Sequence, residues 1–143
     1  MKNIYLLLIV FSFVVSKSQI CFAPYTTYNT QGSGQYHVTS DDWNLDGKKD
    51  VVVCNNNNFF VSLLLGNGAG NFTTTNTFNL SSSPAQSESG DFNSDGKPDL
   101  AIAGGPNNLW LLLGNGSGSF TTTKPISSTN THWLFYEIQL IDG

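Results

Sequence analysis

The sequence DFNSDGKPDLAIAGG, residues 91–105, places three aspartates, an asparagine and a glycine within nine positions and then turns apolar. The same design occurs earlier as DWNLDGKKDVVVCNN, which starts at Asp42. Carboxylates at this density repel one another, so each cluster is expected to have a positive partner. Because the design occurs twice, the chain is best interpreted as a repeat built around an acidic loop.

The unit around this motif can be aligned over residues 42–78 and residues 91–126, with an offset of 49 that becomes 48 before the leucines. The residues before Asp42 resemble the end of a unit, and the C-terminus approaches another loop and stops at IDG. We therefore expect about two and a half units: a partial blade at 22–41, repeats at 42–90 and 91–139, and the start of a truncated repeat at 140–143.

Every segment of the unit is short and β-like. Strands are predicted after the loop (50–54 and 99–103), after an Asn-rich turn (59–65 and 109–113), after a Gly-rich hairpin (from Phe72 and Phe120) and before the next loop (36–40 and around 86–89). No helix-length amphipathic segment intervenes, and the leucine-rich runs must be covered on both faces. The expected fold is all-β, with stacked four-stranded blades of the β-propeller type that form an incomplete propeller.

The acidic loop has the chemistry of a calcium site. In the first loop the side-chain oxygens fall on alternate residues, and Gly47 supplies a left-handed bend. Hard oxygen donors without His or Cys favour Ca2+ over zinc or copper, and Mg2+ would need a stricter octahedron. We expect two calcium sites, with Lys48 and Lys97 contributing backbone carbonyls and the last aspartate binding directly or through water. The expected ligands are Asp42, Asn44, Asp46, Lys48, Asp50, Asp91, Asn93, Asp95, Lys97 and Asp99.

The loop pattern is also compatible with two other kinds of structure. An EF-hand needs a bidentate Glu at its twelfth position and flanking helices, but that position holds Val53 or Ile102, each inside a β-like run. Alternatively, the carboxylates only cap turns by accepting backbone amides, as Asp and Asn often do. The same ligand spacing in both copies favours the metal interpretation.

The loop, the apolar strand and LLLGNGSGSF, in this order and twice, resemble the FG-GAP or VCBS repeat family, which is related to the propeller of integrin alpha chains and is common in secreted bacterial proteins. The likeness covers about residues 22–125. It implies a calcium-binding blade per repeat and a usual role in adhesion or ligand binding. Propellers of this family generally contain about seven blades, so two and a half units imply an open ring.

The N-terminus has the pattern of a secretory signal. A basic start, an apolar run over residues 4–15 and a small-x-small pattern at Ser16–Ser18 predict a signal peptide at 1–18, leaving residues 19–143 as the exported repeat region. About twelve apolar residues are too few to span a bilayer comfortably, although a short buried strand or a membrane anchor stays open. The protein is therefore expected to be secreted or at the cell surface. Export permits a disulfide between Cys21 and Cys54, but Cys54 also fits a small core residue.

Composition excludes several functions. The net charge is -4 and no arginine occurs, which disfavours nucleic-acid binding and a polybasic membrane anchor. No phosphate-binding Gly motif or G-x-S-x-G elbow is present. His37 and His132 are isolated, and nothing places Glu88 near Glu137. We therefore do not expect an enzyme.

Two functions remain open. The first is a secreted, calcium-stabilised module that binds an extracellular protein or a carbohydrate, with possible self-association or continuation in a longer chain. The second is a non-catalytic propeller segment of a larger extracellular enzyme that acts on polysaccharides. Further repeats in the neighbouring coding sequence would favour the first, and a domain with paired catalytic carboxylates would favour the second.

Overall fold

The computed structural model describes residues 25–122 and 126–127 of the chain, and these residues form strands, one short 3-10 helix and connecting loops. The strands are β1 (Gln35–Asp41), β2 (Asp50–Asn55), β3 (Phe60–Gly66), β4 (Phe72–Asn79), β5 (Pro84–Gly90), β6 (Asp99–Gly104), β7 (Asn108–Gly114), β8 (Phe120–Thr122) and β9 (Ile126–Ser127), and the 3-10 helix η1 is Asn56–Asn58. Each predicted strand position is occupied by a strand. The predicted signal peptide, Cys21, His132, Glu137 and the truncated repeat lie outside the described residues.

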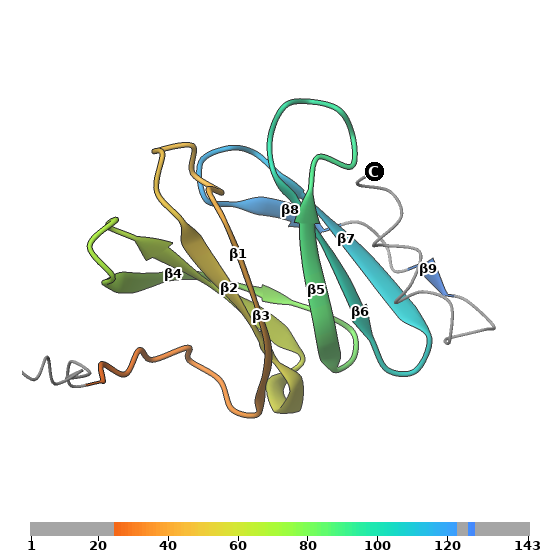
Figure 1. Ribbon diagram of the computed structural model, residues 1–143. Helices are drawn as coiled ribbons and strands as arrows, with labels where there is room; N and C mark the ends of the chain where they lie inside the picture. Colours follow the sequence, from red (N-terminus) through yellow and green to blue (C-terminus); the bar gives the residue numbers. More distant parts are fainter. Residues whose placement is uncertain (1–24, 123–125, 128–143) are drawn as a thin grey trace, which may run out of the picture.

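The strands form two antiparallel sheets in simple up-and-down order. The first sheet has the order β1-β2-β3-β4, and the second has β5-β6-β7-β8 with β9 also paired to β7. β8 and β9 pair with opposite ends of β7, so together they take the place that β4 has in the first sheet. The two sheets lie next to each other, with β1 beside β5 (Figure 1). The predicted all-β fold of four-stranded blades is thereby confirmed, and the described residues form two blades of an open arrangement.

The core lies between the two blades. Alternation along each strand sends one set of side chains to this core and the other set to the opposite face of the sheet. The core residues are Val52, Cys54, Val61 and Leu63 from the first blade, Leu100, Ile102, Trp110, Leu112 and Phe120 from the second, and Trp43 from the first acidic loop. Cys54 is a buried free thiol, as its apolar surroundings in the sequence suggested.

Polar contacts join the two edge strands β1 and β5. Thr39 Oγ1 donates to the Ser87 carbonyl oxygen at 2.8 Å, and the Ser87 amide donates to His37 Nδ1 at 3.2 Å. His37 lies on the edge strand β1 and belongs to the contact between blades. These bonds fix one blade against the other beside the apolar core.

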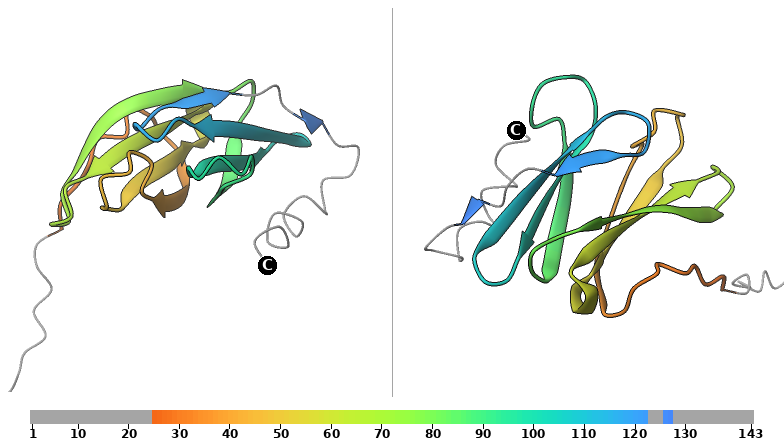
Figure 2. Two further views of the ribbon diagram at one scale, coloured as in Figure 1. Left: turned by 90° about the horizontal axis from the view of Figure 1, so that it is seen from above. Right: turned by 180° about the vertical axis from the view of Figure 1, so that it is seen from behind.

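The segment before β1 runs along the side of the first sheet that faces away from the second sheet (Figure 2). Tyr28 in this segment meets Phe72 edge to face, with ring centroids 5.4 Å apart. Phe78 meets Phe120 in the same way at 5.1 Å, and these two residues are the repeat equivalents of Tyr28 and Phe72. The segment thus occupies the place that β4 has against the second blade.

Among the described residues, no helix is long and apolar enough to cross a membrane.

Candidate metal centre

The first acidic loop joins β1 to β2 and is held by its own side chains. The Asp46 amide donates to Asp42 Oδ1 and to Asn44 Oδ1, both at 3.0 Å. The Gly47 amide donates to Asp42 Oδ2 at 2.8 Å, and Gly47 has the left-handed φ of 81° expected at this position. Because one nitrogen contacts both oxygens, the Asp42 and Asn44 side chains lie close together.

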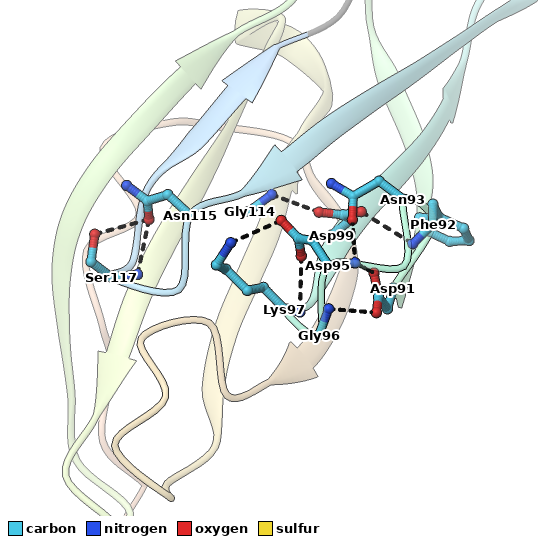
Figure 3. A network of polar contacts seen from close by, with 10 residues as sticks. All are labelled: Asp91, Phe92, Asn93, Asp95, Gly96, Lys97, Asp99, Gly114, Asn115 and Ser117. Carbon is cyan, nitrogen blue, oxygen red and sulfur yellow. Dashed lines mark hydrogen bonds and ion pairs between the residues drawn. The ribbon is translucent and has the colours of Figure 1, made fainter.

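The second loop joins β5 to β6 and repeats this geometry, as Figure 3 shows. The Asp95 amide donates to Asp91 Oδ1 at 3.0 Å and to Asn93 Oδ1 at 2.9 Å, and the Gly96 amide donates to Asp91 Oδ2 at 2.8 Å. Each bond has its counterpart in the first loop. The conformation is therefore a property of the shared sequence pattern rather than of the surroundings of one loop.

The last aspartate of each loop is buried and bridges two distant backbone amides. Asp99 Oδ2 accepts the Phe92 amide at 3.1 Å, and Asp99 Oδ1 accepts the Gly114 amide at 2.7 Å (Figure 3). The carboxylate thus joins the start of its loop to the end of β7. Charge-assisted bonds of this kind are stronger than those between neutral groups, and they compensate for the burial of the carboxylate.

Asp50 makes the equivalent pair of bonds, to the Trp43 amide at 3.1 Å and the Gly66 amide at 2.9 Å. Burial raises the pKa of Asp50 above its ordinary value, and the charge of Asp46 acts in the same direction. The two amides oppose this shift. The carboxylate is consequently held in a position where an added positive charge would favour its ionised form.

A lysine ammonium accompanies each loop. Lys48 Nζ lies 3.0 Å from Asp46 Oδ2, and Lys97 Nζ lies 2.9 Å from Asp95 Oδ2. The hydrogen bond from the lysine is the main reason that the pKa of Asp46 and of Asp95 is lowered. The pKa of Lys97 is raised, first by Asp95 and then by the other carboxylates of its loop. Each loop therefore carries its own positive charge.

The structure brings together some of the expected ligands and separates others. The side chains at the first and third loop positions converge on one amide, whereas Asp50 and Asp99 point toward the interior of the blade. Within residues 25–122 and 126–127, no three His, Cys, Asp or Glu side chains gather closely enough to hold a metal ion. The donors are still carboxylate, amide and carbonyl oxygens, which is the set that calcium prefers, so the residues fit this ion by their chemistry. The ligand assignment stays a prediction.

The sequence pattern did not lead us to the two glycines, Gly66 and Gly114, whose amides donate hydrogen bonds to the buried aspartates. A Cβ on Gly66 would lie 2.1 Å from the Lys49 carbonyl oxygen, and one on Gly114 would lie 2.0 Å from that of Pro98. Only glycine permits this approach of the chain and the bond to the aspartate. The signal was present in the sequence as the conserved end of the leucine run in both copies, LLLG, but it was attributed to the hairpin alone.

The next turn is also closed by a side chain. Asn115 Oδ1 accepts the amides of Ser117 and Ser119 at 2.9 and 3.2 Å, and Asn67 does the same for Ala69 and Asn71. Asx turns of this type hold the Gly-rich hairpin in one conformation. The hairpin lies beside the acidic loop in the second blade, as Figure 3 shows, and lines a hollow together with the acidic loop in the first blade.

Stacked four-stranded antiparallel sheets, each with the same acidic loop between its first two strands, define a repeat protein made of β-propeller blades. A family model described as an FG-GAP-like repeat matches residues 42–102 and residues 91–142. These matches span more than half of the chain, so the protein belongs to the FG-GAP-like repeat family. No curated protein matches the chain significantly.

Proposed function

We propose that the protein is a secreted, calcium-binding FG-GAP module in which the metal is structural and the blades serve a binding or adhesion role. The observation that supports calcium is the occurrence of one oxygen-donor pattern in two loops with the same set of internal hydrogen bonds. A loop that only capped turns would not need to keep every donor in both copies. The role in adhesion rests on the family.

In each proposed site, the ligands are the carboxylates and amide of the loop together with the lysine carbonyl. These are Asp42, Asn44, Asp46, Lys48 and Asp50 in the first blade, and Asp91, Asn93, Asp95, Lys97 and Asp99 in the second. Calcium, when bound, supplies the positive charge that offsets the mutual repulsion of these carboxylates. In the structure, which contains no metal, the lysine ammonium paired with Asp46 or Asp95 supplies part of that positive charge.

The site has a structural consequence because each loop joins the first two strands of a blade. A ligand that binds only the folded form stabilises it by RT ln(1 + [L]/Kd). Extracellular sites of this kind bind calcium with Kd values of about 10⁻⁴ to 10⁻³ M. At a calcium concentration ten times Kd, each site would add about 1.4 kcal/mol to the free energy of unfolding.

Calorimetric titration with calcium tests this proposal, together with thermal unfolding in calcium and in chelator. The wild-type chain should take up two ions and unfold at a higher temperature in calcium. The variant Asp42→Asn with Asp91→Asn should lose both the heat of binding and the shift, since each loop loses a carboxylate. The control Asp41→Asn with Glu88→Gln removes the same charge outside the ligand set and should keep both. Absence of binding heat in the wild type, or equal loss in the control, would contradict the proposal.

The partner that we propose is an extracellular protein or a carbohydrate. Binding of the partner should require ordered blades. The affinity for the partner should therefore fall in chelator in proportion to the loss of folded chain. A glycan array and a panel of extracellular matrix proteins, probed with the labelled chain in calcium and in chelator, would identify the class. Signals that do not change with calcium would separate the binding role from the metal.

A further inference from the structure

The Gly-rich hairpin of each blade begins with an asparagine that is followed directly by a glycine. These pairs are Asn67–Gly68 and Asn115–Gly116, and the sequence contains no other Asn-Gly pair. The amide nitrogen after an asparagine lies where its attack on the side-chain Cγ closes a succinimide ring. Glycine hinders this closure least, because it has no Cβ. Each hairpin therefore contains a nucleophile and an electrophile in adjacent residues.

The side-chain carbonyl of Asn67 is held and polarised by backbone amides. Asn67 Oδ1 accepts the Ala69 amide at 2.8 Å and the Asn71 amide at 3.1 Å. Attack on Cγ places negative charge on this oxygen, and donors that already point at such an oxygen stabilise the charge as it develops. The turn that closes the hairpin therefore also activates the Asn67 side chain toward attack.

The Gly68 amide is free to act as the nucleophile. The amides of residues 67, 69 and 71 all donate hydrogen bonds within the hairpin, whereas in the part of the chain that the structure describes the Gly68 amide donates none. Tyr28 Oη donates to the Gly70 carbonyl oxygen at 2.8 Å, but this bond lies beyond Gly68 in the turn. Residues 67–70 are exposed, so water reaches the ring that the attack would form.

The second hairpin has the same turn but is covered by the first blade. A Cβ on Gly116 would lie 2.8 Å from Leu45 Cδ1, so Leu45 packs directly on the Asn115–Gly116 pair. Gly118 is buried and donates its amide to the Trp43 carbonyl oxygen at 3.0 Å. Ring closure requires the peptide plane between the asparagine and the glycine to turn, and these contacts oppose that movement.

The first hairpin lacks this cover. The three atoms nearest to an added Cβ on Gly68 all belong to the flexible Lys48 side chain. A Cβ on Gly70, the equivalent of Gly118, would meet nothing within 4 Å. The peptide plane after Asn67 is therefore freer to turn than the one after Asn115.

We propose that Asn67 is a site of spontaneous deamidation, whereas the equivalent Asn115 is protected. The Gly68 nitrogen forms a bond to Asn67 Cγ and gives up its proton, the bond from Cγ to Nδ2 breaks, and Nδ2 leaves with a proton as ammonia. Water then opens the succinimide. Breaking the bond from the Gly68 nitrogen to Cγ gives aspartate, and breaking its bond to the Asn67 carbonyl carbon gives isoaspartate. In sum, one water is consumed and one ammonia is released, with no oxidation or reduction.

The modification changes the surroundings of the first acidic loop. Gly68 lines a hollow of about 380 Å³ together with Gly47 and Lys48 of that loop, and either product places a new carboxylate next to this hollow. Aspartate keeps the turn, because its carboxylate accepts the same two amides. Isoaspartate routes the main chain through Cβ, which lengthens the hairpin and breaks the turn. The first blade thus gains a negative charge that the second blade does not.

Peptide mapping by mass spectrometry tests the proposal. The folded chain is incubated in mildly alkaline, isotopically heavy water and is then digested in ordinary water. Asn67 should convert at least several-fold faster than Asn115, with one heavy oxygen taken up for each conversion. An isoaspartate-specific methyltransferase should label the same peptide. In guanidinium chloride, where the blades are unfolded, the two rates should become similar.

Two variants test the protection of the second hairpin. Leu45→Ala uncovers Gly116 and should raise the rate at Asn115 several-fold without changing the rate at Asn67. Leu45 is 54% exposed, so this variant should fold, and circular dichroism verifies that it does. The control Ser94→Ala, at the equivalent exposed position of the second loop, should leave both rates unchanged.

Equal rates at Asn67 and Asn115 in the folded chain would overturn the proposal, because the turn would then protect both side chains or neither. A folded Leu45→Ala variant in which Asn115 stays as slow as in the wild type would also overturn it, since Leu45 would not be the cause of the difference. The wild-type comparison between folded and unfolded chain decides the matter even where a variant does not fold.

Discussion

Leu45 of the first acidic loop packs directly against Gly116 in the Gly-rich hairpin of the second blade, so that a Cβ on Gly116 would lie 2.8 Å from Leu45 Cδ1. The two residues are far apart in the chain, and their contact ties the first acidic loop to the neighbouring repeat. Gly68 is the equivalent of Gly116 in the first blade, and the three atoms nearest to an added Cβ there all belong to the flexible Lys48 side chain. The two glycines therefore form a matched pair for measuring this contact.

Gly116→Ala should destabilise the chain more than Gly68→Ala. Both glycines have positive φ, 73° and 78°, so both substitutions cost about 1–2 kcal/mol for a left-handed alanine. Gly116→Ala also displaces Leu45, which adds about 1–3 kcal/mol typical of overpacking. Unfolding in urea measures the difference. Equal losses would show that Leu45 moves aside without cost.

Asp99→Asn should lower the free energy of unfolding by about 1–3 kcal/mol in the presence of chelator. An asparagine can accept only one of the two amides of Phe92 and Gly114, and its NH2 group would face the other donor. The chelator ensures that the loss does not come from a bound ion. Glu88→Gln serves as the control because Glu88 is exposed on the neighbouring strand β5. A loss no larger than that of the control would contradict the bridging role.

Acid should destabilise the metal-free chain below about pH 3.8, the ordinary pKa of aspartate. The Lys48 and Lys97 ammonium groups lower the pKa of Asp46 and Asp95 in the fold. A lowered folded pKa contributes stability that is present above the unfolded value and is lost as the pH falls through the folded value. Asp50 acts in the opposite direction, because burial raises its pKa.

Unfolding in urea with chelator, repeated from neutral pH to pH 3, measures this dependence. The variant Lys48→Met with Lys97→Met should show a shallower loss in acid, because Asp46 and Asp95 lose the largest cause of their lowered pKa. An unchanged slope in this variant would show that other groups govern the acid response.

The two acidic loops and the leucine runs were sufficient to predict the architecture from the sequence. The last aspartate of each loop marks where the next strand begins, because β2 starts at Asp50 and β6 starts at Asp99. Local sequence patterns carry such features because the residues that make them are neighbours in the chain.

The contacts between blades could not be predicted in this way. Thr39 and Ser87 are separated by 48 residues, and neither has a neighbour in the sequence that indicates the bond between them. Phe60 starts an apolar strand, yet it is only partly buried and lies outside the core cluster. Which face of a strand is buried depends on the next repeat, and this information is not local.

The bridges made by Asp50 and Asp99 have a practical consequence for altering the protein. Asp50 reaches an amide 16 residues away and Asp99 one 15 residues away, yet both bonds form, because the additional residue of the first copy lies in the turn after β2. That turn lies at the tip of the β2–β3 hairpin, whereas the carboxylate closes the base of the hairpin at the other end. Foreign peptides inserted at residues 56–58 should leave the hydrogen-bonded base unchanged, but they should break the bonds that Asn56 donates to the Gly34 and Pro84 carbonyl oxygens and so loosen the segment before β1.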